Sequence, residues 1–463
     1  IYNSDDLSIA ATETIEIKAG IDYVNNPLQL QFRLKEMREA AEPFEYEIIE
    51  VTEDSFTIAW NTVSKITDFK LEAYKYPYYL ELEFNNDKNQ HTITGLKPNL
   101  TYSIYFNTNY LHDLHTWYGF NVKTYGEDAK APKVNFSSEI INDLVAEELG
   151  IYFRDVTEAD MKELVYLHIY NDEEISSLEG LQFAENLTEL YALGHNISDI
   201  SVLQNLTNLY YLDLGYNEIE NVDALEKLTE LESLDLASNK VKDISKLANL
   251  TNLEFLDIQY NDIDDISVLA NFKKLITLKA YGNNISDITA IKNLVNLETI
   301  ELPSNQIENI DALTKLSKLR FLDLSDNEIS TIPDLSSLSN LQELYLYENN
   351  ISEISGVQGL TNLESLALGY NKISRIPDLS SLTNLQELIL YNNEIEDISG
   401  ITGLSNLTAI GLGNNKISNL PDLSSLTNLE ELDLYKNEIT DISGLKGLNN
   451  LRYLDLSENN IED

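Results

Sequence analysis

The strongest constraint on the fold of this chain is a 22-residue unit that recurs over its C-terminal part. The segment "LTNLYYLDLGYNEIENVDAL" from Leu206 returns nearly unchanged as "LTNLEFLDIQYNDIDDISVL" from Leu250. Both follow the pattern LxxLxLxxNxI, whose asparagine recurs every 22 residues from Asn217 to Asn459. One register upstream, His195 takes the place of the asparagine. A unit this short cannot bury its leucines alone, so the repeats must stack on one another.

This period and this leucine spacing predict a leucine-rich repeat solenoid. We expect each repeat to supply a short strand of a curved parallel sheet, a turn, and a return segment whose leucines point inward. The recurring asparagine stands where the chain leaves the strand, and its side-chain amide both donates and accepts hydrogen bonds. We therefore expect a structural asparagine ladder and assign these residues no catalytic role.

Beyond Ile329 the return segments alternate between two types. One contains proline, as in "IPDLSSL", and the other contains glycine, as in "ISGVQGL". The prolines are Pro333, Pro377 and Pro421, and the glycines are Gly356, Gly400 and Gly444. Both series step by 44 residues, which indicates duplication of a two-repeat unit. Because proline excludes a regular helix, we expect extended backbone or a single 3₁₀ turn there.

Residues 134–166 are predicted to form a helical cap in front of the repeats at 167–463. Ser137 or Ser138 precedes "EIINDLVAEEL", and Thr157 precedes "EADMKEL", as helix N-cap residues. A helical piece with a polar back suits the open end of a solenoid. The array stops on a repeat boundary at "LDLSENNIED", from which we expect the natural chain to continue.

Upstream, the hydrophobic period falls to two in "SFTIAW", "YLELEF", "HTITGL" and "TYSIYFNT", which predicts a small β-sandwich over residues 44–126. This segment resembles a fibronectin type III module. The resemblance makes Trp60 the buried core tryptophan and places Leu96, Pro98 and Tyr102 in a tyrosine corner. Residues 1–43 remain unassigned and partly β. Residues 127–133 are interpreted as a linker, so that sandwich and array fold separately.

Enzymatic chemistry is not indicated. The sequence lacks G-x-S-x-G and H-E-x-x-H motifs, a phosphate-cradling glycine loop and any cysteine. His112 and His115 lie close together, but no third ligand stands nearby, which favours an exposed loop or strand end over a metal site. Acidic stretches such as "NDIDDIS" lack the EF-hand spacing, which favours solvated carboxylates over bound calcium. We predict no cofactor and no metal.

The charge of the chain excludes two classes of partner. Acidic residues number 78 against 31 basic ones, a net charge of −47, which opposes binding to nucleic acid or to an anionic membrane. No apolar run reaches about 20 residues, so no membrane insertion is predicted. The negative charge does not exclude cationic partners.

The residues that vary between repeats are those expected to bind. In a strand, neighbours of a buried leucine face the opposite side, and here many of them are aromatic or acidic. Aromatic residues repeated along a rigid surface commonly anchor protein interfaces. The predicted binding residues of this concave face are Tyr211, Tyr216, Phe255, Tyr260, Tyr281, Phe321, Tyr345, Tyr347, Tyr370, Tyr391, Tyr435, Asp213, Asp257, Asp323, Glu343, Glu387 and Asp433.

The repeats with turns such as "NISDIS", the helical segment before them, the lack of cysteine and the immunoglobulin-like module together resemble the internalin-like surface proteins of Gram-positive bacteria. That family usually carries its immunoglobulin-like domain after the repeats, whereas here the module precedes them. The resemblance implies a secreted or wall-attached protein that binds a protein ligand, such as a host receptor or extracellular protein, in adhesion or virulence. A cell-wall polymer is a second kind of ligand.

Two other classes of function stay open. Eukaryotic phosphatase-regulating proteins use similar 22-residue repeats, which makes an intracellular interaction scaffold the first alternative. The second is the binding region of a larger enzyme. The fibronectin-like module favours the extracellular interpretation, and a signal peptide upstream of Ile1 would support it.

Overall fold

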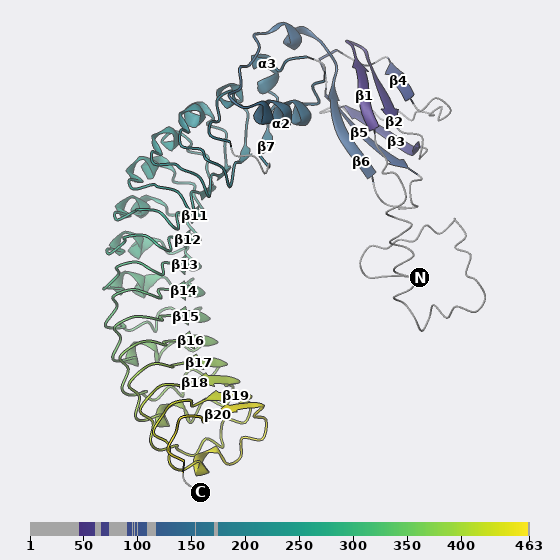
Figure 1. Ribbon diagram of the computed structural model, residues 1–463. Coiled ribbons are helices and arrows are strands. Elements are labelled where there is room, and N and C mark those ends of the chain that lie inside the picture. Colours follow the sequence, from purple (N-terminus) through teal and green to yellow (C-terminus); the bar gives the residue numbers. More distant parts are fainter. Residues whose placement is uncertain are drawn as a thin grey trace, which may run out of the picture. The chain divides into compact units, whose positions relative to one another are not determined.

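The computed structural model describes residues 46–60, 66–73, 90–94, 96, 98–99, 101–108, 117–152, 154–170 and 175–461. The chain divides into two compact units at the boundary between Leu167 and His168 (Figure 1). The histidines His112 and His115 and the unassigned segment 1–43 lie outside the described residues. None of the helices in the described ranges is long and apolar enough to cross a membrane.

The smaller unit contains two three-stranded antiparallel sheets. One sheet has the order β1 (Tyr46–Val51), β2 (Ser55–Trp60), β4 (Gln90–Thr94), and the other has the order β3 (Ile66–Ala73), β5 (Thr101–Thr108), β6 (Trp117–Lys123). A single apolar cluster takes side chains from both sheets, among them Phe56, Ile93, Ile104 and Val122. The described strands therefore form two layers around one core. The predicted strand "YLELEF" at residues 79–84 lies outside the described residues. Trp60, Leu96 and Tyr102 are all buried, while Pro98 is exposed.

The two predicted helical signatures are confirmed. Helix α2 (Glu139–Leu149) follows Ser138 and ends at Gly150, which adopts a left-handed backbone with φ of 67°. Helix α3 (Glu158–Met161) is a single turn that Thr157 and Asp160 close as a reciprocal capping box.

A buried ion cluster joins the sandwich to these helices. Lys123 at the end of β6 is fully buried, and its Nζ lies 2.8 Å from Oδ1 of Asp160 and 3.3 Å from Oδ2 of Asp128. The Nη1 atom of Arg154 lies 2.6 Å from the other oxygen of Asp160. Burial alone would raise the pKa of Asp160, but Arg154 and Lys123 outweigh it and hold that pKa well below its usual value.

Residues 127–133, which we interpreted as a linker, are part of the same packing. They contain the 3₁₀ turn η3 (Glu127–Lys130), and Oγ1 of Thr157 donates a 2.8 Å hydrogen bond to the carbonyl of Asp128. The backbone N–H of Lys123 donates to the carbonyl of Gly150 at 2.6 Å. We therefore expect the sandwich and the helices to unfold together.

The larger unit is the repeat array. In the part of the chain that the structure describes, its sheet has fourteen strands in consecutive order from β7 (Tyr166–His168) to β20 (Tyr453–Asp455), with parallel pairing from β8 onward. The strands between are β8 (Glu189–Tyr191), β9 (Tyr211–Asp213), β10 (Ser233–Asp235), β11 (Phe255–Asp257), β12 (Thr277–Lys279), β13 (Thr299–Glu301), β14 (Phe321–Asp323), β15 (Glu343–Tyr345), β16 (Ser365–Ala367), β17 (Glu387–Ile389), β18 (Ala409–Gly411) and β19 (Glu431–Asp433). This confirms the leucine-rich repeat solenoid.

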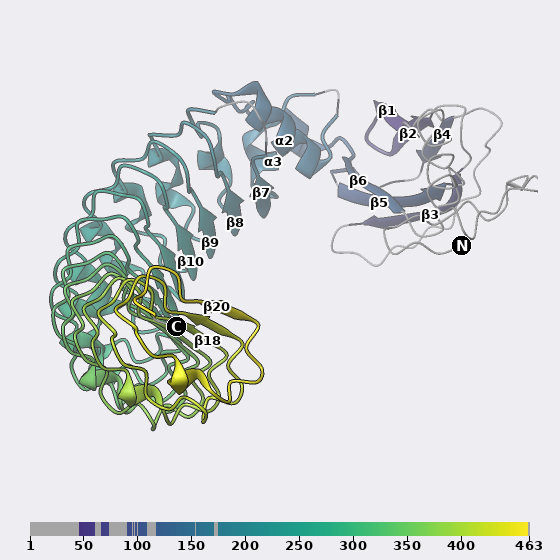
Figure 2. The ribbon, with the colours of Figure 1, turned by 60° about the horizontal axis from the view of Figure 1, so that its bottom comes forward.

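The return segments form short 3₁₀ turns in most repeats. These are η4 (Leu181–Phe183), η5 (Ser201–Asn205), η6 (Asp223–Leu225), η7 (Ser245–Asn249), η8 (Ser267–Asn271), η9 (Thr289–Asn293), η10 (Asp311–Lys315), η11 (Ser355–Val357), η12 (Ser399–Ile401) and η13 (Ser443–Leu445). Figure 2 shows the array as an arc, with strands such as β8, β9 and β10 along its inner side and the return segments along its outer side. The strands therefore line the concave face.

The asparagine ladder is present as predicted, and Asn327 illustrates it. Its Nδ2 donates to the carbonyls of Leu302, Leu324 and Ser325 at 3.0, 3.0 and 3.1 Å. Its Oδ1 accepts the backbone N–H of Ile307 at 2.9 Å. One side chain therefore satisfies buried backbone groups of its own turn and of the preceding repeat.

The alternation of proline and glycine is explained by how neighbouring repeats pack against each other. No helix forms over Pro333 in this described segment, as predicted, and the N–H of Leu335 instead donates to the carbonyl of Gly356 in the next repeat at 3.0 Å. A Cβ on Gly356 would lie 2.3 Å from the carbonyl oxygen of Pro333. The glycine is therefore needed because two backbones touch, and the same contact recurs at Gly400 and Gly444.

Candidate ligand-binding face

The concave face presents three columns of side chains. We call the residue before the central leucine or isoleucine of each strand the first column, the residue after it the second column, and the residue two positions further on the third column. Neighbouring strands pair with their central residues in register, as Leu212, Leu234 and Leu256 do. Residues 22 apart therefore lie side by side in each column. These three leucines are fully buried, whereas Leu454 on the last strand, β20, is 41% exposed.

A row of three aspartates occupies the second column on β9, β10 and β11. Asp235 pairs in register with Asp213 on one side and with Asp257 on the other. Burial, with the charges of Asp257 and Asp213, raises the pKa of Asp235 to about 7, although the N–H of Ala237 opposes the rise. Burial raises the pKa of Asp257 to about 6. These carboxylates are therefore held close together at an energetic cost to the free protein.

The next strands continue the second column with mixed charge. Lys279 on β12 lies 3.2 Å from Glu301 on β13. Asp323 on β14 follows, and burial raises its pKa.

Tyrosines and small residues alternate further along the array. The rings of Tyr347 and Tyr391 approach to 5.9 Å between centroids. Gly369 lies between them in the third column, where a Cβ would come within 2.9 Å of the Tyr391 ring. The hydroxyl of Tyr345 donates to Oε2 of Glu343 at 2.7 Å, and burial raises the pKa of Tyr345 to about 12. The glycine thus lets two rings lean toward each other over the sheet.

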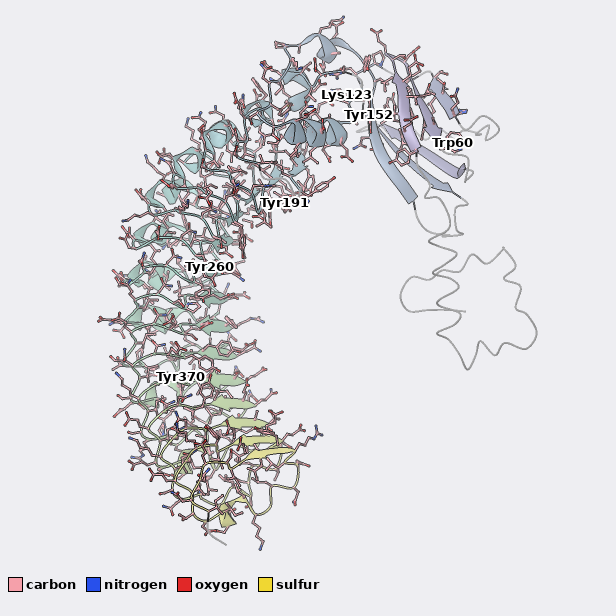
Figure 3. All side chains as sticks on the ribbon, viewed as in Figure 1. Trp60, Lys123, Tyr152, Tyr191, Tyr260 and Tyr370 are labelled. Carbon is pink, nitrogen blue, oxygen red and sulfur yellow. The ribbon has the colours of Figure 1, made fainter. Side chains whose placement is uncertain are left out.

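Three of the predicted tyrosines lie at the rim of the sheet and not within its columns. Tyr216, Tyr260 and Tyr370 each precede the ladder asparagine and have left-handed backbone, with φ of 53°, 50° and 55°. The chain turns out of the strand at this residue, so strict alternation no longer applies. Their side chains are 58%, 49% and 51% exposed. Figure 3 labels Tyr260 and Tyr370 on the array.

The remaining predicted residues lie in the three columns. The first column holds Tyr211, Phe255, Phe321, Glu343 and Glu387; the second holds Asp213, Asp257, Asp323, Tyr345 and Asp433; the third holds Tyr281, Tyr347, Tyr391 and Tyr435. The structure brings Phe321 close to Tyr345, and Tyr281 close to the rim residue Tyr260. A role for these residues in binding stays a prediction.

Sequence reasoning missed three concave residues. The ring of Tyr191 on β8, labelled in Figure 3, stacks on that of Tyr211 with centroids 4.5 Å apart. The centroid of the His168 ring lies 5.4 Å from that of Tyr191. Lys279 on β12 was the third. The signal was available, because His195 marks the register of β8, and Tyr191 falls in its second column.

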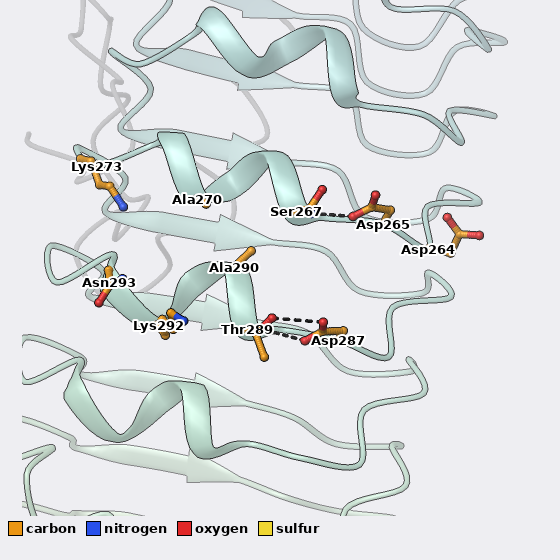
Figure 4. Close-up of a pocket in the computed structure, with 10 residues that line it drawn as sticks. All are labelled: Asp264, Asp265, Ser267, Ala270, Lys273, Asp287, Thr289, Ala290, Lys292 and Asn293. Carbon is orange, nitrogen blue, oxygen red and sulfur yellow. Dashed lines mark hydrogen bonds between the residues drawn. The ribbon is translucent and has the colours of Figure 1, made fainter.

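A hollow on the outer side of the array carries no recognisable chemistry. It has a volume of about 450 Å³ and lies between η8 and η9 (Figure 4). Its Asp265 and Asp287 accept the backbone N–H groups of Ser267 and Thr289 at 2.7 and 2.8 Å, which is a turn-forming role. Within the described ranges no three His, Asp or Glu side chains gather in a way that would hold a metal ion.

The comparisons with known proteins agree with this geometry. The family model described as "Leucine Rich repeats (2 copies)" matches residues 229–271, 295–337, 317–350, 339–381, 383–425 and 427–463, and the model described as "Leucine rich repeat" matches 195–241. No curated protein sequence matches the chain significantly.

Solved structures extend the comparison. An internalin (inlF) from Listeria monocytogenes is 32% identical with a TM-score of 0.66, and the match covers 71% of this chain and 99% of the internalin. A leucine-rich repeat protein of Leptospira interrogans is 25% identical with a TM-score of 0.58, covering 65% of this chain and 86% of that one. The plant peptide hormone receptor RGFR1 in complex with RGF2 is 25% identical with a TM-score of 0.60, covering 66% and 53%.

The fold and the concave face thus define a protein-interaction solenoid. The chain belongs to the leucine-rich repeat family, and its array is of the internalin-like kind.

Proposed function

We propose that this chain is a secreted or cell-surface protein of a Gram-positive bacterium, which binds a protein ligand through the concave face of its array. Adhesion to a host, or a role in virulence, is the biological setting we propose. The similarity to an internalin over 99% of that protein's chain supports the class. The complex of a similar plant receptor array with RGF2 supports ligand binding by this kind of fold.

The observation that carries the proposal is a group of large, partly exposed rings on a rigid sheet. Tyr370 is 51% exposed at the rim and contacts the half-buried Tyr391, which in turn lies close to the half-buried Tyr347 over Gly369. Tyrosine contributes a large apolar area with few rotatable bonds, which makes it an effective interface anchor. Partly exposed rings gathered in this way mark a surface that a ligand can cover.

We propose further that the smaller unit is a fibronectin type III-like module. Its sheet orders, β1-β2-β4 and β3-β5-β6, and its buried Trp60 and Tyr102 support this assignment. Such a module accompanies extracellular proteins and favours the surface interpretation over an intracellular scaffold.

The test is a quadruple substitution of the tyrosine group. We expect replacement of Tyr345, Tyr347, Tyr370 and Tyr391 by alanine to leave the array folded, because the leucines form its core. The affinity for a partner identified by pull-down from host extracellular proteins or cell-wall polymers should fall by at least about tenfold. The matched control is Tyr210→Ala with Val295→Ala, which removes apolar side chains that are 39% and 51% exposed outside the three columns. Unchanged binding by the tyrosine variant, with loss of binding in the control, would refute the proposal.

A further inference from the structure

Apart from Lys279, the charged residues of the concave columns from β8 to β20 are all acidic. In the described strands β8–β11 and β13–β20, every charged residue of the three columns is an aspartate or a glutamate. The one lysine in these columns from β8 to β20 is Lys279, and Glu301 neutralises it at 3.2 Å. Other basic side chains of the array, such as Lys240 and Arg452, pair with glutamates outside the columns. The concave face is therefore far more acidic than the chain as a whole, in which 31 basic residues accompany 78 acidic ones.

Rings stand next to these carboxylates in a repeated arrangement. On β9, β11 and β14 the first column holds an aromatic ring and the second column of the same strand holds an aspartate. On β14 and β15 the order reverses from strand to strand, so that Phe321 pairs with Glu343 and Asp323 pairs with Tyr345. Side chains two residues apart on one face of a strand are about 6.5 Å apart. Each pair thus offers a ring face and a carboxylate within reach of one ligand side chain.

We propose that the protein ligand presents arginine side chains to this face, with one guanidinium seated on the ring of Tyr211 and paired with Asp213 and Asp235. A guanidinium is planar, stacks on aromatic faces and bonds carboxylates through two parallel N–H groups. A lysine ammonium has the same charge but is compact and strongly hydrated, and it gains less from a ring beside a carboxylate. This inference rests on the proposed function and names the chemistry of the partner.

The carboxylates are oriented before any ligand arrives. Oδ1 of Asp213 accepts the N–H of Gly215 at 3.0 Å, and Oδ1 of Asp235 accepts the N–H of Ala237 at 2.8 Å. Tyr191 stacks behind Tyr211 at 4.5 Å and holds that ring in place. A cation inserted here would relieve the repulsion between like charges on adjacent strands, which are about 4.8 Å apart. Pre-organised groups of this kind lose little freedom on binding.

The experiment measures binding of two synthetic peptides to the full chain. One peptide alternates arginine and serine, the other lysine and serine, and each carries a fluorescent label for anisotropy. About eight extended residues span about 26 Å, which matches the roughly 24 Å from β9 to β14. At about 0.15 M salt, we expect the arginine peptide to bind at least about tenfold more tightly than the lysine peptide.

Two matched variants locate the site. The first variant combines Asp213→Asn, Asp235→Asn and Asp257→Asn. It keeps the Oδ1 acceptors and should weaken binding of the arginine peptide at least about tenfold. The second variant combines Glu220→Gln, Glu230→Gln and Glu308→Gln. It removes the same charge from exposed positions outside the columns and should change the affinity for the arginine peptide less than about twofold.

Three outcomes would overturn the inference: equal affinities for the two peptides, an equal loss in both variants, or no binding of the arginine peptide to the wild-type chain. The tyrosine variant described above tests the proposed function separately. If it still abolishes capture of a protein partner, the concave face binds proteins, and only the arginine chemistry is wrong.

Discussion

Replacing Asp235 by asparagine should stabilise the free protein at neutral and alkaline pH. Asp235 stands between Asp213 and Asp257, and its pKa is raised to about 7 from an ordinary value of 3.8, first by burial and then by these neighbours. Asparagine has the same shape and keeps the acceptor for the N–H of Ala237, which lies 2.8 Å from Oδ1. The substitution therefore removes the charge and keeps the turn.

The sign and size of the change in unfolding free energy follow from proton linkage. Because the folded-state pKa exceeds the unfolded value, the native state holds a proton between about pH 4 and pH 7, and the stability of the wild type falls as pH rises through that window. A rise from 3.8 to about 7 corresponds to about 4 kcal/mol at most. Solvent screens the carboxylate on this open face, so we expect about 1–2 kcal/mol. The variant should melt roughly 2–5 °C higher at pH 8 and at nearly the same temperature as the wild type at pH 4.

Thermal unfolding followed by far-ultraviolet circular dichroism at the two pH values is the assay. Asp265→Asn is the control, because that exposed aspartate also accepts a turn N–H, from Ser267 at 2.7 Å, but lies outside the columns. The control should show no pH-dependent gain in melting temperature. A lower melting temperature for Asp235→Asn at pH 8, or an equal gain at both pH values, would show that the substitution does not act by removing a buried charge beside two other carboxylates.

Two further predictions concern the frame of the molecule. Asn327→Ala removes four hydrogen bonds, three of them buried, and should destabilise the array by at least about 2 kcal/mol in denaturant unfolding. Alanine at the exposed Asn340 should cost less than about 1 kcal/mol, and equal losses would mean that the ladder adds nothing beyond a surface amide. Lys123→Met should destabilise the smaller unit by about 3 kcal/mol, because it leaves the buried Asp160 with one cationic partner fewer. The chain has two tryptophans, Trp60 and Trp117, both in the smaller unit, so tryptophan fluorescence reports that unit directly. An unshifted fluorescence transition would show that the ion cluster does not hold the sandwich to the helices.

The array was predictable because its constraints are local and repeated. A period of 22 with fixed leucines fixes the strand, the turn and the stacking direction, and the ladder asparagine follows from its place after the strand. The proline segments were predictable for the same reason, since proline excludes a helix wherever it stands. What the sequence did not reveal is why glycine accompanies proline one repeat later. That reason is a contact between backbones of Gly356 and Pro333, which side-chain patterns do not encode.

The sequence predicted which residues lie on or near the concave face better than it predicted how they are arranged there. Alternation placed Tyr211 and Asp213 correctly on the strand, but it failed for Tyr216, because the backbone becomes left-handed at that residue. The raised pKa of Asp235 needs the parallel register, which puts residues 22 apart in direct contact. The attachment of the helices through Lys123 was also beyond sequence reasoning, because a lone lysine in a strand is ordinarily exposed.

The repeat architecture lets one face carry two kinds of chemistry. Strands β9–β11 present carboxylates beside rings, whereas β15–β17 present tyrosines separated by Gly369. Each repeat contacts only its neighbours, so a substitution in one column changes the displayed surface without altering a shared core. Six strand-to-strand spacings separate β9 from β15, a distance of about 29 Å, which is beyond the range at which substitutions ordinarily couple. A ligand that spans both stretches would thus be held by two nearly independent sets of contacts, one set by charge and one by apolar area, and raising the salt concentration should weaken only the first.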